Sequence, residues 1–319
     1  MKRFTWSAIP ETAADFEALM SAADSALASQ GVEVVGRPLH IAHTLYGAFG
    51  WGGNIFPPRE LAERPGFSGE VLIAKALKWY EEAYGDQLKT DMALGSAPVV
   101  LGNAVWELRA KRYWGPVRYF VDRDLGNRGV TVGGRGVDSS FNVLCAVEKL
   151  PQGLADRLSD AALAHMFQFY ISTLHSLEWA NQLPDTPLLS MAVTDYLEST
   201  AAVIGGRYGQ ARWAAEQAVE KTMKGVLDVG DKRFPTGGAK GHDLEHLRGL
   251  LQEELGIVVP PGAVVAANCS ADVRYGKVTS SQAEALAANH SVLEVFHHFS
   301  KSPQTAQVLR AQRPARLRA

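Results

Sequence analysis

The chain has only two cysteines, Cys145 and Cys269, among its 319 residues. Two cysteines cannot by themselves build a disulfide framework or a four-ligand zinc site. We therefore expect each of them to be a buried, small apolar residue, as free cysteines usually are. Such sparse cysteine usage fits a reducing compartment.

The sequence also lacks a strong net charge, a long apolar run and a leader pattern. Its formal net charge is -2, so no global field draws it towards nucleic acid or acidic membranes, although a local basic surface is compatible with that total. No run of 18 apolar residues is present, and no apolar segment follows the basic pair at residues 2 and 3. The sequence therefore predicts a cytoplasmic protein that makes no membrane contact.

The composition is that of an ordinary globular protein. Hydrophobic residues make up 46% of the chain and charged residues 21%, which argues against disorder over most of its length. The length is sufficient for two domains. The pattern along the chain changes from mixed to helical, so the expected fold class is α+β.

Residues 1–185 are expected to form a mixed α/β domain whose role the sequence does not reveal. Regular patterns predict two helices, 12–29 and 69–83, a hairpin of 104–112 with 117–121, and a central strand over 141–147. Glycine and proline make the segment 49–58 irregular, and five glycines predict a mobile loop over 126–136.

Residues 186–302 read as an all-helical bundle. Apolar residues first recur at helical spacing over 158–183, before this domain. Within it they recur over 188–204, 208–227, 242–255 and 280–299. Because Pro184 and Pro187 interrupt this series, the domain boundary is placed between Pro184 and Leu188. The segment 303–319 is basic, has no acidic residue, and is expected to be a disordered tail.

The helix predicted over 208–227 has two opposite faces. Small apolar residues form one face and would let a partner helix approach closely. The other face carries Arg212, Glu216, Glu220 and Lys224 at i,i+4 spacing. We expect this second face to be solvated and to hold only weak ion pairs.

A polar, glycine-rich loop leads from this helix to His242 and Asp243. Such a loop, followed by a helix start, can present backbone N–H groups to an anion. His242 occupies the expected N-cap position, and Asp243 in the first turn favours the helix dipole. His242 and His246 share a face, but the residue after His242 is Asp243 and no third ligand is signalled, so no metal site is predicted.

Two further motifs carry candidate residues. Arg274 and Tyr275 lie in a short loop before the last long helix, where the arginine can cap carbonyls, pair with an acidic side chain or face a phosphate. His290 and His297 lie seven residues apart on that last helix, a spacing more typical of packing than of chemistry.

Residues 188–300 resemble a HEPN domain, the higher-eukaryote and prokaryote nucleotide-binding helical domain. The resemblance rests on an ordered series of motifs over 208–224, 241–247, 273–275 and 283–287. It implies a compact bundle of antiparallel helices, often a homodimer, that binds a nucleotide or RNA in defence, toxin–antitoxin or RNA-processing systems. The ligand-facing residues would be His242, Asp243, Arg274, Tyr275 and Lys224, with no bound cofactor.

The sequence departs from the RNase members of that family. Those members carry an arginine separated from a later histidine by four to six residues, and no arginine stands at that spacing before His290, His297 or His298. The spacing occurs only from Arg37 to His43, outside the bundle. The first hypothesis is therefore binding without cleavage.

Two alternatives remain open at this stage. One is a metal-independent RNase or toxin with a diverged site, for which His242, Arg274 and His290 are the catalytic candidates. The other is a non-enzymatic module that dimerises and contacts a protein partner through residues 1–185. In that case four tryptophans of the N-terminal half would form a docking surface, namely Trp51, Trp79, Trp106 and Trp114.

Overall fold

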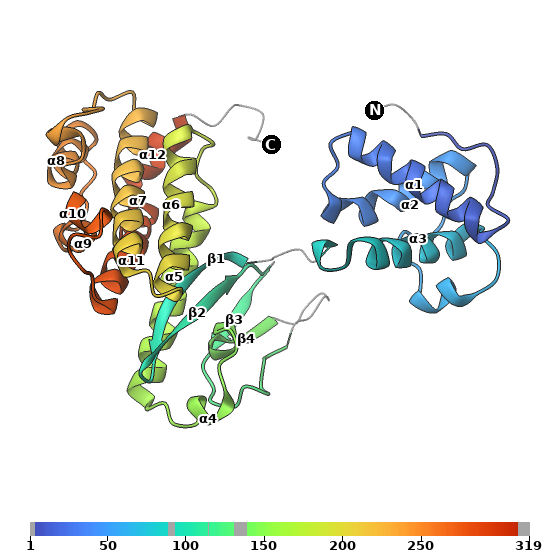
Figure 1. The fold of residues 1–319 in the computed structure, drawn as a ribbon, viewed down its shortest axis with the longest axis horizontal. Helices are drawn as coiled ribbons and strands as arrows, with labels where there is room; N and C mark the ends of the chain where they lie inside the picture. The colour runs from blue at the N-terminus through green and yellow to red at the C-terminus, as the bar shows by residue number, and fades with distance from the viewer. Residues whose placement is uncertain (1–3, 89–92, 114, 131–138, 312–319) are drawn as a thin grey trace. The chain divides into compact units, whose positions relative to one another are not determined.

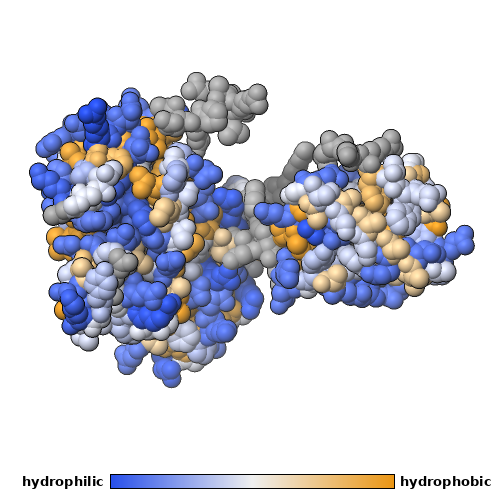
Figure 2. Space-filling model, turned by 45° about the horizontal axis from the view of Figure 1, so that its top comes forward, coloured by the Kyte–Doolittle hydropathy of each residue, from blue (hydrophilic) through white to orange (hydrophobic). Residues whose placement is uncertain are grey.

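A computed structural model describes residues 4–88, 93–113, 115–130 and 139–311, except for the side chains of Ala239, Arg274 and Ala311. Contacts divide the chain into two compact units, Met1–Asp91 and Met92–Ala319 (Figure 1). Figure 2 shows mainly hydrophilic residues on the visible face of each unit, with apolar residues interspersed. None of the described helices is long and apolar enough to cross a membrane.

The N-terminal unit is helical. Its elements are α1 (Ala13–Ser29), α2 (Arg37–Phe49) and α3 (Gly69–Tyr84), with 3-10 turns at Val34–Gly36, Arg59–Glu63 and Gly85–Leu88. α1 begins at a capping box, in which Thr12 accepts from the backbone N–H of Asp15 and the Asp15 carboxylate accepts from that of Thr12. The predicted helices 12–29 and 69–83 are confirmed. Of the segment 49–58 predicted to be irregular, Phe49 ends α2, Gly50 is its C-cap, and 51–58 is irregular. This unit contains no strand among its described residues. The strands of the mixed α/β domain predicted over 1–185 therefore all belong to the other unit.

A buried polar network joins the three helices of this unit. Asp24 on α1 is 9% exposed, and its carboxylate accepts from Arg37 Nη1 at 3.0 and 3.1 Å. The hydroxyls of Tyr80 and Tyr84 on α3 donate to the same carboxylate at 3.0 and 2.6 Å. Arg37, the first residue of the stray arginine–histidine spacing, therefore has a structural role.

The C-terminal unit contains the strands and the long helices. Its strands are β1 (Ala93–Leu101), β2 (Ala104–Lys111), β3 (Val117–Phe120) and β4 (Ser139–Asn142). Its helices are α4 (Gln152–Ala155), α5 (Asp160–Ala180), α6 (Pro187–Ile204), α7 (Tyr208–Val229), α8 (Leu244–Leu255), α9 (Pro261–Ala267), α10 (Ala271–Arg274), α11 (Gln282–Lys301) and α12 (Pro303–Ala311). Two small sheets with many helices confirm the α+β class.

The predicted hairpin between 104–112 and 117–121 is wrong. β2 pairs antiparallel with β1, which precedes it, through a two-residue turn that places Gly102 at a φ of 63°. β3 instead pairs in parallel with β4. The expected strand over 141–147 is also shorter than predicted, because a 3-10 turn follows β4 at Val143–Ala146.

The β1–β2 hairpin belongs to the same core as the long helices. Three side chains donate to β1 carbonyl oxygens: Asn181 after α5 to Leu94, Tyr196 on α6 to Ser96, and His290 on α11 to Pro98, at 2.8, 2.7 and 2.7 Å. One hydrophobic cluster runs from these strands to α11. The chain therefore separates after Asp91, whereas the sequence predicts a boundary near residue 185.

The segment 303–311 differs from the expected disordered tail. It forms α12, and Thr305 in its first turn is fully buried. Val308 and Leu309 pack against the main core of the unit. Residues 312–319, the remainder of that predicted tail, lie outside the described residues, as does much of the predicted loop 126–136.

The Asp24 network makes a testable prediction for the N-terminal unit. Replacing Asp24 with Ala leaves the Arg37 guanidinium buried without its partner, which costs about 3 kcal/mol. Hydrogen exchange in peptides from α1, α2 and α3 of the full chain should therefore quicken roughly a hundredfold. Glu33→Ala removes an exposed carboxylate nearby and should leave exchange unchanged. Unaltered protection in Asp24→Ala would contradict the structural role of this network.

Candidate functional site

Helix α7 lies at the centre of the helical part of the C-terminal unit. It packs against α6 and α11 along its length and is also contacted by α8, α9 and α10 (Figure 1). The small-residue face predicted from the sequence is buried, with Ala211, Ala215 and Ala218 fully covered. Gly225 lets α6 and α7 pack closely, because a Cβ at this position would lie 2.6 Å from the Leu189 side chain of α6.

The charged face of α7 is buried, which corrects the expectation of a solvated stripe. Glu216 is 5%, Glu220 3% and Lys224 6% exposed. The physical reason lies in the segments that follow α7, because α8, α9 and α10 return against it and cover this face. Two carboxylates and an ammonium group are thus removed from water on one side of a helix, where each needs a partner.

The Glu220 carboxylate has a partner for each oxygen. Lys224 Nζ donates to Oε1 at 2.7 Å, and His242 Nδ1 lies 2.9 Å from Oε2. Because a carboxylate only accepts, Nδ1 of His242 carries the hydrogen of that bond. The His242 side chain is 62% exposed, so the buried pair fixes one edge of the ring while Nε2 faces outward. Such a carboxylate–histidine pair holds an imidazole in one tautomer and one orientation.

Glu216, one turn before Glu220, does not have a partner for each carboxylate oxygen. Its Oε2 is buried and makes no hydrogen bond in the described structure. Burial raises the pKa of Glu216 to about 7, and the neighbouring Glu220 carboxylate adds to the rise. The Cys269 backbone, His242 and Arg212 act in the opposite direction. The Glu216 carboxyl group therefore holds a proton over much of the range below neutral pH.

Arg212 ends this row of charges at the N-terminal side of α7. Its Nη1 lies 3.3 Å from a Glu284 carboxylate oxygen and 3.4 Å from Ser280 Oγ, while Nη2 lies 3.4 Å from the Asn268 carbonyl oxygen. The guanidinium therefore ties α7 to the segment before α11.

We call the buried set Glu216, Glu220 and Lys224, together with His242, the α7 charge cluster.

Asp243 has a structural position next to this cluster. α8 begins at Leu244, and Asp243 is its N-cap, accepting from the backbone N–H of His246 at 3.0 Å. The prediction that His242 occupies the N-cap is therefore wrong by one residue. Among the described residues, no group of three or more His, Cys, Asp and Glu side chains is placed to hold a metal ion.

The structure places the other predicted residues away from His242. Tyr275 is 69% exposed and follows α10, which packs near Gly209 at the start of α7, roughly 15 Å of helix axis from Glu220. The side chain of Arg274 lies outside the described residues. His290 bonds Pro98 on β1 and contacts the Phe169 ring at 4.8 Å between centroids, and burial lowers its pKa. The three catalytic candidates are thus not brought together in the described structure.

The described tryptophans of the first half are packing residues. Trp51 stacks on Phe49 at 4.7 Å between ring centroids. Trp79 Nε1 donates to the Glu17 carboxylate at 2.8 Å, and Trp106 Nε1 donates to the Leu101 carbonyl at 3.1 Å. Each is partly buried against its own core, and Trp51 and Trp79 belong to a different unit from Trp106. Trp114 lies outside the described residues, so three of the four give no support to a shared docking surface.

The two cysteines are free thiols. Cys269 is buried and Cys145 partly buried, close to the expectation for both. Burial raises the pKa of the Cys269 thiol to about 11, which makes it a poor nucleophile. Neither thiol therefore joins the candidate site as a reactive group.

No protein-family model, curated protein or solved structure matches this chain. Function is therefore argued from the α7 charge cluster itself. Of its four members, the sequence singled out His242 and Lys224 as ligand-facing and placed Glu216 and Glu220 on a solvated surface. The sequence shows only two carboxylates one turn apart on a helix, and that pattern does not distinguish a buried face from a solvated one.

Glu216 makes the stability of this unit depend on pH in a stated direction. Its pKa rises from 4.5 to about 7 on folding, so the folded protein binds more protons than the unfolded chain in that window. The free energy of unfolding therefore falls as pH rises through it. Glu216→Gln cannot ionise, so its advantage over the parent should grow to about 3 kcal/mol near pH 8.5 and vanish near pH 4.

Urea denaturation of both proteins at these two pH values measures the difference. Glu253→Gln, which removes an exposed carboxylate on α8, should show no such pH-dependent gain. A constant difference between Glu216→Gln and the parent across this range would mean that Glu216 titrates normally.

Proposed function

We propose that the helices of residues 186–302, within the unit Met92–Ala319, form a HEPN-like bundle that binds a nucleotide or RNA without cutting it. One observation carries the proposal. The exposed His242 ring, at the end of the loop 232–241, is bonded through Nδ1 to the buried Glu220 carboxylate, which also pairs with Lys224. When it is protonated, the oriented imidazole can donate from Nε2 to a phosphate oxygen while Nδ1 stays bonded to Glu220, and the cationic side chains of the loop add further donors.

The loop 232–241 supplies the cations. Arg233 and Lys240 are exposed and form no ion pair with a described residue, whereas Lys232 pairs with Glu254 at 3.4 Å. Three glycines in the loop leave backbone N–H groups accessible to an anion. We infer that a phosphate group lies between this loop and Nε2 of His242.

The buried charges beneath the loop support an anionic ligand. Glu220 and Lys224 are opposite charges in direct contact, so they nearly cancel at the surface. Glu216 adds little negative charge while it holds its proton. The exposed Arg233 and Lys240 then add positive charge on the loop, which attracts phosphate.

The helix order supports the HEPN-like part of the proposal. α6 and α7 are joined by only three residues, so they run antiparallel as neighbours. α8 and α11 then pack against α7. Binding is favoured over cleavage because His242 is a lone oriented imidazole, and the sequence lacks the arginine–histidine spacing of the RNase members.

The proposal extends to the setting and the assembly. We place the protein in a defence, toxin–antitoxin or RNA-processing system, as the resemblance implies, and propose a homodimer. Leu197 and Ile204 support the dimer, since they are 44% and 39% exposed and lie seven residues apart on one face of α6. The N-terminal unit is then free to contact a protein partner.

Calorimetric titration of the full chain with ATP, GTP and a short single-stranded RNA tests the proposal. At least one of these should bind, with an affinity that falls as salt is raised. His242→Ala, and separately Arg233→Ala with Lys240→Ala, should weaken that binding about tenfold or more, which is about 1.4 kcal/mol. Arg157→Ala removes an exposed arginine beside α4, at the opposite end of the same unit (Figure 1), and should bind normally.

The alternatives give different results in the same series. If none of the three ligands binds, or if the Arg157→Ala control weakens binding as much as His242→Ala, the proposed phosphate site is wrong. Labelled RNA incubated with the protein and a chelator should remain intact. Cleavage that disappears in His242→Ala would overturn the binding-only proposal in favour of a diverged, metal-independent RNase.

A further inference from the structure

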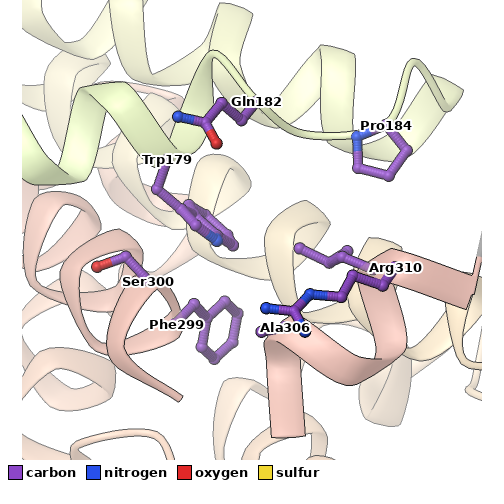
Figure 3. A pocket seen from close by; sticks show the side chains of 8 residues that line it. Trp179, Gln182, Pro184, Phe299, Ser300, Ala306 and Arg310 are labelled. Atoms are coloured by element: carbon purple, nitrogen blue, oxygen red, sulfur yellow. The ribbon is translucent and has the colours of Figure 1, made fainter. Parts of the chain in front are cut away.

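A second site lies in the C-terminal unit, away from the α7 charge cluster. It is a cavity of about 240 Å³ between the end of α5, the segment leading to α6, the end of α11 and α12 (Figure 3). Its lining side chains are Trp179, Gln182, Pro184, Phe299, Ser300, Ala306, Leu309 and Arg310. All of them belong to one unit, so the cavity is a feature of that unit alone.

The wall of the cavity is aromatic and fixed. The Trp179 ring lies 5.7 Å from the Phe299 ring at an interplanar angle of 67°, and 5.5 Å from the Phe296 ring. Phe299 and Phe296 are almost fully buried, which holds the tryptophan in place. An apolar cavity of roughly 150 Å³ is enough to hold benzene. The space here therefore accepts one ring system with a small substituent.

The rim of the cavity offers uncommitted donors. The Arg310 guanidinium, the Gln182 side-chain amide and Trp179 Nε1 make no hydrogen bond or ion pair with another described residue. Figure 3 shows the Arg310 side chain extending across the cavity towards Phe299. None of the lining residues is acidic. A flat apolar wall beneath an unpaired guanidinium is suited to an aromatic ring that carries an anionic group.

The larger cavity of the N-terminal unit lacks this selectivity. It measures about 890 Å³, but the charges on its rim are paired with one another, Arg59 with Glu81 and Lys78 with Glu63. No cation there is left to choose a ligand by its charge. The cavity beside Arg310 is smaller, but it places an aromatic ring and an unpaired guanidinium next to each other.

We propose that this cavity, called the Arg310 cavity, binds a small aromatic carboxylate, with its ring against Trp179 and its carboxylate on Arg310 and Gln182. This site is separate from the phosphate site at His242 and does not depend on the function proposed for it. Two parallel N–H groups of a guanidinium match the two oxygens of a carboxylate, which gives both affinity and orientation.

Titration of the full chain with indole-3-carboxylate, measured by calorimetry, tests this proposal. The neutral analogue indole-3-carboxamide should bind at least tenfold more weakly, because it has no negative charge to pair with the Arg310 guanidinium. Cyclohexanecarboxylate should also bind at least tenfold more weakly, because it loses the flat ring. Arg310→Ala should reduce affinity for the acid about tenfold, and Arg310→Lys should reduce it less.

Two control variants isolate the site. Lys301→Ala removes an exposed cation at the end of α11 that does not line the cavity, and His242→Ala removes the other proposed site. Both should bind indole-3-carboxylate normally. The proposal is overturned if the acid does not bind, if acid and amide bind equally, or if Lys301→Ala weakens binding as much as Arg310→Ala.

Discussion

The position of the Glu220 carboxylate is the constraint on which the candidate site depends. A carboxylate that is 3% exposed needs a partner on each oxygen, and here Lys224 from the same helix and His242 from the following loop supply them. The requirement joins two parts of the chain. α7 cannot bury this face unless the loop 232–241 returns over it, and the loop cannot place His242 there without the carboxylate. The exposed imidazole is thus oriented as a consequence of how α7 is covered.

Local patterns in the sequence predicted most of the long helices, whereas α2, the short helices and the strand pairings were not predicted. α1 and α11 begin at capping boxes, and α5, α6, α7, α8 and α11 match predicted ranges within a few residues. These signals lie within single segments, where apolar spacing and end residues determine the structure. The partner of β2 depends instead on β1, whose glycine and proline obscure any alternation, and β3 and β4 are 18 residues apart in the sequence. The early boundary after Asp91 has the same origin, because only packing shows that β1 shares the core of α11.

The same distinction explains what the sequence indicated about the site. His242 and Lys224 were singled out because they belong to an ordered series of motifs, and the structure places both in contact with Glu220. Glu216 and Glu220 were placed in water because i,i+4 charges on a helix usually lie on its surface. Their burial depends on segments that follow α7 by 10 to 60 residues, which no local pattern reveals. His290 was a candidate by residue type, and its hydrogen bond to β1 gives it a packing role.

The orientation of His242 is the central claim, and long-range proton–nitrogen NMR of its ring tests it most directly. At a pH where the ring is neutral, our account predicts that Nδ1 carries the proton, held by Glu220, while Nε2 is unprotonated and faces solvent. Adding the nucleotide or RNA that binds should then protonate Nε2, shift its resonance and leave the Nδ1 proton in place. A ring protonated on Nε2 in the free protein, or an Nε2 resonance that does not respond to any bound nucleotide or RNA, would contradict the account.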